Sequence, residues 1–283
     1  MSLYDDASLV LIPDGAKAGK LYSVKPTDGS GDFTFSRSTF ANRIDENGAN
    51  EEMAIDLPRI DYRNGSCPDL LIEPERTNWF LNSQTGLTQT VTVSSGTEYT
   101  VSFSGTGTIA FTGGYTGSLV GTGSDRVSVT FTTTSTSVTC TVSGTVQYVN
   151  FEEGGYDTSW IETTGSSATR SGDVTSVSYN VPSSGSIYVS LSDYKEDEFT
   201  ILSYEFAAST IKNDIAIAFS PTTLKVSHNG TIVIDETGTY DTTSMTNIDL
   251  GHDSGTDQLG GGINSFLVFD RILTDTELNS LTI

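Results

Sequence analysis

Apolar and polar residues alternate with a period of two through the middle of the chain. In residues 81–165, Tyr99, Val101 and Phe103 are separated by Thr and Ser, and segments 127–131 and 138–142 repeat the scheme. One apolar face and one hydroxyl-bearing face are typical of antiparallel strands in a half-buried sheet. Glycine-rich turns separate the segments at short intervals, which favours a small β-sandwich or jelly roll.

A second alternating region begins near residue 166. Three of its segments carry an apolar residue at every second position, and these are 187–191, 202–206 and 215–219. The pattern predicts a second antiparallel sandwich after the first.

Two local signals add a hairpin and a helix to the second region. Asn229-Gly230 lies in the middle of LKVSHNGTIVID, where a type I′ turn requires such residues. Near the C-terminus, Thr274 and Glu277 form a T-x-x-E capping box. This box predicts one short helical turn with Leu278 and Leu281 facing inward.

The patterns together predict an all-β protein of two antiparallel β-sandwiches with very little helix. Residues 1–80 form a strand-and-loop block at the N-terminus, and whether it adds strands to the C-terminal sandwich stays open. Residues 81–165 form the small sandwich, and residues 166–283 form the second one. Arginine is concentrated in 33–80, whereas 81–165 contains a single arginine and no lysine.

The charge of the chain excludes several classes of partner. Thirty-six acidic and 14 basic residues give a formal net charge of −22 over 283 residues. A surface of this sign repels phosphate backbones, which argues against nucleic-acid binding. No segment approaches the roughly 20 apolar residues of a membrane-spanning helix. The N-terminus lacks the basic and apolar regions of a signal peptide, so we expect synthesis in a cytoplasm without a leader.

No catalytic constellation is present in the sequence. Its two histidines, His228 and His252, have no serine elbow or metal-ligand spacing beside them. Cys67 and Cys140 define no disulfide framework, and Cys140 falls on an apolar strand face, which predicts a buried thiol. The paired acidic residues are adjacent in sequence, so a strand would place them on opposite faces. We therefore predict no catalytic residues.

Calcium and carbohydrate are the ligands left to consider. Acidic loops at Asp45–Gly48 and at His252–Asp257 could receive calcium, but Asp-Gly and Asn-Gly pairs are also ordinary turn residues. We expect no resident metal or cofactor, with calcium as the open alternative. Carbohydrate sites use exposed aromatic rings, and the candidate rings are Trp79, Trp160, Tyr115, Tyr156 and Tyr194. The predicted binding residues are Trp160, Tyr194, His252, Asp253 and Asp257.

One block of sequence resembles a signature of bacteriophage tail and virion proteins. FTFSRSTFANRIDENGANEE (33–52), LPRIDY (57–62) and CPDLLIEPERTN (67–78) are similar to that signature in order and wording, and TSWIETTGSSATRSGD (158–173) resembles the phrase that follows the small sandwich in such proteins. The matching residues are Arg37, Asn47-Gly48, Pro58-Arg59, Asp61-Tyr62, Leu70-Leu71, Glu73 and Arg76-Thr77-Asn78. Trp160 and Glu162 depart from the usual Tyr and Pro.

The end of the chain resembles a concanavalin A-like or laminin-G-like lectin domain. The stretches that carry this resemblance are LKVSHNGTIVI, the IDLG of 248–251 and GGINSFLVFDRILTDTEL. It implies a concanavalin A-like sandwich over 166–283 and, for 81–165, a sandwich like those of carbohydrate-binding modules. A shared fold of this kind does not by itself determine function.

Together the resemblances imply a virion structural protein in a tail fibre, tail tip or head fibre that recognises a host surface polysaccharide. Its partners would be other virion proteins, and a homo-oligomer is the default for such appendages. Two alternatives stay open: a purely structural decoration or collar protein, and a glycan-degrading enzyme of the tail.

The charged stretch CPDLLIEPERTNW raises a separate question, because its carboxylates, arginine and thiol could suggest an active site. We interpret it as a structural brace. Glu73 and Arg76 are close enough in sequence to pair with each other or with neighbouring arginines such as Arg59, and a buried pair of this kind is costly to break singly.

Overall fold

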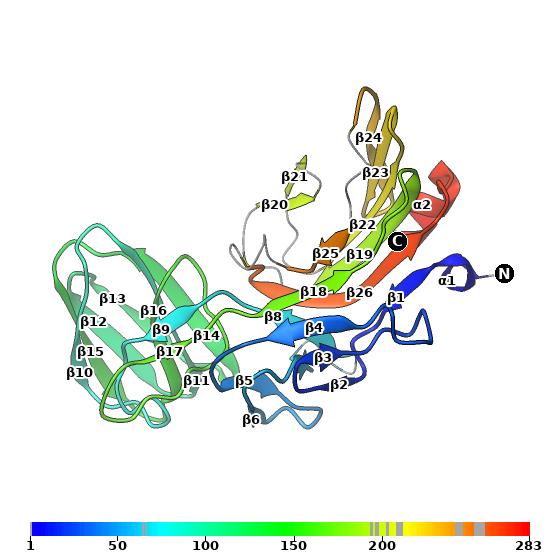
Figure 1. The fold of residues 1–283 in the computed structure, drawn as a ribbon. Helices are drawn as coiled ribbons and strands as arrows, with labels where there is room; N and C mark the ends of the chain where they lie inside the picture. The colour runs from blue at the N-terminus through cyan, green and yellow to red at the C-terminus, as the bar shows by residue number, and fades with distance from the viewer. Residues whose placement is uncertain are drawn as a thin grey trace. The chain divides into compact units, whose positions relative to one another are not determined.

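The computed structural model describes residues 2–63, 65, 67–192, 195, 198–201, 204–207, 212–240, 246–251 and 258–283. The chain divides into two compact units (Figure 1). The large unit comprises Met1–Ser38, Arg43–Pro74 and Gly172–Ile283, and the small unit comprises Thr39–Asn42 and Glu75–Ser171. Most of the small unit, Glu75–Ser171, is thus a single insertion in the sequence of the large one. Both units are built from antiparallel strands, and the protein is all-β with two short helices among the described residues.

An eight-stranded antiparallel sheet forms one layer of the large unit. Its order is β24-β23-β22-β19-β26-β8-β7, and β1 pairs with the far end of β26. Strands from the N-terminal block therefore lie in the same sheet as strands from the C-terminal region. The bounds are β1 (Leu9–Leu11), β7 (Arg59–Asp61), β8 (Asp69–Ile72), β19 (Gly185–Ser192), β22 (Lys212–Phe219), β23 (Thr223–His228), β24 (Thr231–Thr237) and β26 (Gly261–Phe269).

A five-stranded sheet of order β2-β3-β4-β18-β25 forms the second layer of the large unit. The apolar core lies between the two sheets, and Phe33 meets Phe266 edge to face across it with ring centroids 6.4 Å apart. This makes the large unit a β-sandwich. The bounds are β2 (Ala16–Lys17), β3 (Lys20–Leu21), β4 (Phe33–Ser36), β18 (Val174–Ser178) and β25 (Asn247–Asp249).

The eight-stranded sheet is buried on both faces at its centre. In β22, Ile215 and Ile217 enter the sandwich core, whereas the intervening Ala216 belongs to a second cluster on the opposite face. The helix α2 (Asp275–Leu281) covers that face and inserts Leu278, which is fully buried. Small alanine side chains on this side let the helix approach the sheet closely.

The predicted capping box and hairpin are both confirmed. The Thr274 side chain accepts from the Glu277 amide, and the Glu277 side chain accepts from the Thr274 amide, so α2 begins as the sequence indicated. Asn229 and Gly230 have φ angles of 47° and 81°, as the turn between β23 and β24 requires.

The small unit is a second, smaller β-sandwich. One layer has the order β10-β15-β12-β13 and the other β14-β11-β16, with a two-stranded ribbon of β9 and β17. Its bounds are β9 (Arg76–Asn78), β10 (Gln89–Thr92), β11 (Glu98–Gly105), β12 (Thr108–Gly113), β13 (Gly117–Val120), β14 (Gly123–Thr132), β15 (Ser137–Ser143), β16 (Gln147–Glu153) and β17 (Ala168–Arg170).

The apolar positions of the small unit's strands form its core. Val101, Phe103 and Phe131 lie in one cluster with Cys140, which confirms the alternation seen in the sequence. Burial raises the pKa of the Cys140 thiol to about 12, which keeps it protonated and unreactive at neutral pH.

Three further short elements complete the described structure. They are the helix α1 (Leu3–Asp6), the hairpin of β5 (Ala41–Ile44) with β6 (Asn50–Met53), and the hairpin of β20 (Glu198–Ile201) with β21 (Tyr204–Ala207). Leu202, which the alternation placed in a strand, lies outside the described residues. No helix in the described part of the chain is long and apolar enough to cross a membrane.

The boundaries between the units differ from those expected near residues 80 and 165. The structure divides the chain after Pro74 and after Ser171. The reason is that β9 pairs with β17, so the residues just outside the expected boundaries belong to the small unit. Periodicity could not reveal this pairing because both strands are only three residues long.

Candidate functional site

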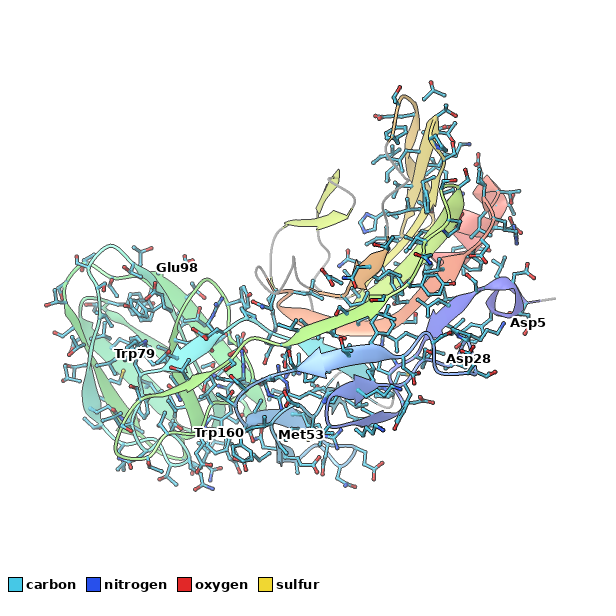
Figure 2. The ribbon with its side chains drawn as sticks, viewed as in Figure 1. Asp5, Asp28, Met53, Trp79, Glu98 and Trp160 are labelled. Atoms are coloured by element: carbon cyan, nitrogen blue, oxygen red, sulfur yellow. The ribbon has the colours of Figure 1, made fainter. Side chains whose placement is uncertain are left out.

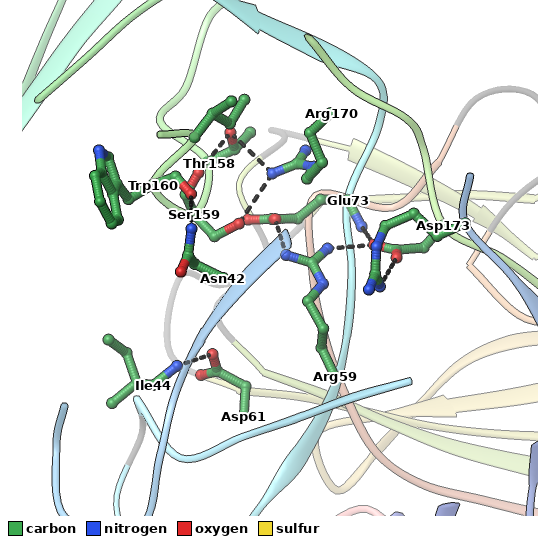
Figure 3. Close-up of polar contacts among 12 residues, drawn as sticks. Asn42, Ile44, Arg59, Asp61, Glu73, Thr158, Ser159, Trp160, Arg170 and Asp173 are labelled. Atoms are coloured by element: carbon green, nitrogen blue, oxygen red, sulfur yellow. Dashed lines mark hydrogen bonds and ion pairs between the residues drawn. The ribbon is translucent and has the colours of Figure 1, made fainter. Parts of the chain in front are cut away.

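Residues of the arginine-rich signature converge on Asp173 in the interior of the large unit. Arg37 donates through Nη1 to Asp173 Oδ1 at 3.1 Å, and Arg59 donates through Nη2 to Asp173 Oδ2. Arg59 Nη1 lies 2.6 Å from Glu73 Oε2 (Figure 3). The Arg37, Arg59 and Asp173 side chains are fully buried, and that of Glu73 is 4 % exposed.

This buried cluster is electrically balanced, with two guanidinium groups against two carboxylates. Burial lowers the pKa of Arg59, but the Asp173 and Glu73 carboxylates outweigh it and hold that pKa above its usual value. The Arg59 guanidinium stays charged inside the protein because the two carboxylates are fixed around it. The cluster is enclosed, so it gives a substrate no access and its role is structural.

The cluster also joins the two points where the small unit leaves the large unit's chain. The Glu73 amide donates to Asp173 Oδ2 at 3.0 Å, and the Asp173 amide donates to the Glu73 carbonyl at 3.0 Å. Within the large unit, residues 100 positions apart in sequence are therefore held as neighbours.

The brace predicted for Glu73 has Arg59 as its partner, and Arg76 lies elsewhere. Arg76 belongs to the small unit, where its guanidinium lies over the Tyr156 ring at 5.1 Å from the centroid. The neighbouring Gly154 has a φ angle of 134°, which side-chain-bearing residues rarely adopt, and a Cβ there would also lie 2.9 Å from the same guanidinium. Of the two pairings considered for Glu73, the one with Arg59 is present and the one with Arg76 is not.

Asn78, the last residue of the R-T-N signature, ties three backbone segments of the small unit together. Its Nδ2 donates to the carbonyls of Val149 and Ile161, and its Oδ1 accepts from the amides of Phe80 and Phe151. Asn78 is fully buried. The asparagine of the R-T-N motif is therefore explained by a structural role in the small unit.

A second buried carboxylate lies in the small unit. Glu152 accepts from the Thr158 amide at 2.9 Å and from the Thr158 hydroxyl at 2.6 Å. Arg170 donates to the Thr158 hydroxyl at 3.3 Å and to the Ser159 hydroxyl at 2.9 Å. Burial raises the pKa of Glu152 against the Thr158 hydrogen bonds and the Arg170 charge, which lower it. The cluster fixes the TSWIET segment against β16.

Trp160 was predicted as a sugar-stacking residue, and the structure corrects this. It is 7 % exposed, and its Nε1 donates to the Ser83 hydroxyl at 3.0 Å. Its ring meets that of Tyr148 edge to face at 4.9 Å. An indole has an apolar ring system and one polar N–H group. Here the ring system is buried and the N–H group has a hydrogen-bond acceptor.

The remaining predicted binding residues, Tyr194, His252, Asp253 and Asp257, lie outside the described residues. The other acidic loop that was considered for calcium is described. There, Asp45 Oδ1 accepts from the amides of Asn47 and Ala49, as in an ordinary turn. Within the described ranges, no group of three or more His, Cys, Asp and Glu could hold a metal ion.

Trp79, one of the aromatic candidates, lies on the outer surface of the small unit. It directly follows β9 and is labelled in Figure 2. Its exposed fraction is 41 %. Its neighbours Asn78 and Phe80 are fully buried, so the alternation of the strand turns Trp79 outward. The binding residues predicted from the sequence did not include Trp79, although its position two residues after Thr77 on a short strand indicates a side chain on the exposed face.

Hydroxyl groups accompany Trp79 on the same face of the β9–β17 ribbon. Thr77 shares this face by the two-residue repeat, and its Oγ1 lies 2.7 Å from that of Thr169 on β17. Ala168 pairs with Asn78, so the exposed Ser167 comes opposite Trp79. We call the outward side chains of Glu75, Thr77, Trp79, Ser167 and Thr169 the ribbon face.

Comparison with known proteins gives no family. No protein-family model matches the chain, and no curated protein matches it in sequence. One similar solved structure is the CBM40 of Ruminococcus gnavus IT-sialidase bound to α2,3-sialyllactose, at 16 % identity over 37 % of this chain and 85 % of that one, with a TM-score of 0.28. Another is domain 4 of a GH43 arabinanase from Geobacillus stearothermophilus with arabinotriose, at 12 % identity over 46 % and 82 %, with a TM-score of 0.33. TM-scores of this size carry no function over to this chain.

Proposed function

We propose that this chain is a structural protein of a bacteriophage virion whose small unit binds a glycan on the host surface. The ribbon face supports the binding role, and the exposed indole of Trp79 beside two threonine hydroxyls is the observation that carries it. The virion assignment rests on the signature residues in the N-terminal block. Tail fibre, tail tip and head fibre all agree with it, and the proposed partners are other virion proteins and further copies of this chain.

The ribbon face combines the two kinds of contact that a sugar ring offers. The ring has an apolar C–H face, which packs on the electron-rich face of an indole. Hydroxyl groups project around its edge, and they need donors and acceptors placed beside the aromatic platform. Thr77 and Thr169 supply hydroxyls that both donate and accept. No covalent step is required, so the proposal is a binding protein and not an enzyme.

Replacement of Trp79 tests the binding role. We expect Trp79→Ala to weaken binding to any recognised glycan about fivefold or more on an array of bacterial surface polysaccharides, because stacking on one aromatic ring contributes on the order of 1 kcal/mol or more. Trp79→Phe keeps a ring and should retain most of the affinity.

Leu87→Ala is the matched control, because Leu87 is an apolar side chain of the small unit that is 58 % exposed. It should leave binding unchanged. Equal binding by wild type and Trp79→Ala would reject the ribbon face as the site. Failure to bind any polysaccharide would favour a decoration or collar protein that uses its sandwiches only for packing.

The virion assignment has its own test. Antibodies against the chain should label an appendage of purified phage particles in electron micrographs. Their failure to label particles that come from a host expressing the chain would contradict the assignment, whatever the glycan array shows.

A further inference from the structure

The ribbon face carries one kind of charge. Glu75 precedes β9, and the two-residue repeat places it on the side of Thr77 and Trp79. Glu75 is exposed, as are Ser167 and Thr169 across the ribbon. The face therefore presents an indole, hydroxyl groups and a carboxylate, without a cationic side chain among its members.

The cations of the small unit are engaged elsewhere. Its sequence contains three arginines and no lysine. The Arg76 guanidinium lies on the opposite side of β9, over Tyr156. Arg170 is 1 % exposed. Arg126 donates to the Ser102 hydroxyl at 2.8 Å and to the Tyr148 carbonyl at 2.7 Å. Arg170 donates to the hydroxyls of Thr158 and Ser159.

The small unit and the whole chain carry a net negative charge, as the ribbon face does. Seven carboxylates stand against the three arginines in the small unit, which gives a formal charge of −4. The whole chain carries −22. An anionic sugar at the ribbon face would meet a carboxylate and a negative field, and none of the five side chains of the face could neutralise its charge.

We propose that the ribbon face takes an uncharged glycan and discriminates against anionic ones; this rests on the proposed glycan-binding function. A sugar ring stacks on Trp79, and its hydroxyls exchange hydrogen bonds with Thr77 and Thr169. The Glu75 carboxylate accepts a hydrogen bond from a hydroxyl of the adjoining sugar. A uronate or sialic acid carboxylate cannot donate at that position, and its charge is repelled there.

Matched pairs of sugars test this discrimination on the full chain. The probes are immobilised neutral oligosaccharides from bacterial surfaces and the same oligosaccharides oxidised at C6 to uronates. We expect the neutral member of a recognised pair to bind about tenfold more tightly at low ionic strength, because two like charges a few ångströms apart repel strongly near a protein surface. The difference should shrink as salt is added.

A variant of Glu75 separates its charge from its hydrogen bond. Glu75→Gln keeps an acceptor oxygen and removes the charge. The affinity for the neutral oligosaccharide should therefore stay within about threefold of wild type, while the ratio of its affinity to that of the uronate decreases. Glu98→Gln removes the same charge from another exposed position of the small unit and should leave the preference unchanged.

Three outcomes are distinct. Trp79-dependent binding with a neutral preference that Glu75→Gln reduces supports the inference. Trp79-dependent binding with equal or tighter binding of the uronates overturns it and leaves the proposed glycan-binding function standing. Binding to neither member of any pair contradicts the glycan-binding function, and the inference falls with it.

Discussion

Asp173 is the residue on which the large unit's interior depends most directly. Its two carboxylate oxygens accept from two arginines and from the Glu73 amide, and its own amide donates back to Glu73. A buried carboxylate is stable only if its lone pairs are occupied. Each arginine in turn loses its counter-charge if one carboxylate is removed, so the members of the cluster support one another.

Arg59→Ala should therefore be strongly destabilising. It leaves Glu73 and Asp173 buried with one guanidinium between them, and breaking such a cluster on one side costs about 3–5 kcal/mol. The free energy of unfolding in urea measures the loss. Arg76→Ala is the matched control, because Arg76 is half-buried and stacks on one tyrosine ring, a contact of about 0.5–1 kcal/mol. An Arg76→Ala protein that is less stable than Arg59→Ala would contradict this account.

At the scale of elements, alternation and capping predicted most of the strands and the helix. The apolar faces of β11 and β22 and the start of α2 each depend on residues within a few positions of one another. Local patterns could not predict the burial of Trp160, because its hydrogen-bond partner Ser83 is 77 positions away in sequence. The Arg59–Asp173 pair could not be predicted from local patterns either, because its residues are 114 positions apart.

The docking of α2 should weaken in acid. The Arg271 hydrogen bonds and the Thr274 amide hold the pKa of Glu277 near 2, below its ordinary value of 4.5. A carboxyl group whose pKa is lower in the folded than in the unfolded protein stabilises the fold at pH values above the pKa of the unfolded state. This stability is lost as the pH falls from about 4.5 toward 2. Urea midpoints measured across this range should fall more for wild type than for Glu277→Gln. Parallel curves for the two proteins would exclude this contribution.

At the scale of the whole molecule, the small unit is an insertion whose two ends meet. Glu73 and Asp173 bond to each other through their backbones, and inside the insertion β9 pairs with β17. The large unit's chain could therefore be closed without the insertion, and each unit keeps its own apolar core.

Excision of Glu75–Ser171, with Pro74 joined to Gly172 through two glycines, should leave a large unit that folds. Pro74 follows Glu73 and Gly172 precedes Asp173, and Glu73 and Asp173 are already in backbone contact, so the short link adds little strain. A β-rich circular dichroism spectrum and one cooperative calorimetric transition are the expected results. The same excision with Asp173→Ala should fail to fold. An unfolded chain from the first variant would show that the large unit depends on the insertion.

The positions of the two tryptophans have an optical consequence. Both belong to the small unit, so fluorescence excited in the indole band reports on that unit alone. Trp160 is shielded and hydrogen-bonded, which favours short-wavelength emission, whereas Trp79 is partly open to water and emits further to the red. A sugar that covers Trp79 would shift the red component, and the emission of Trp160 would serve as a reference inside the same molecule.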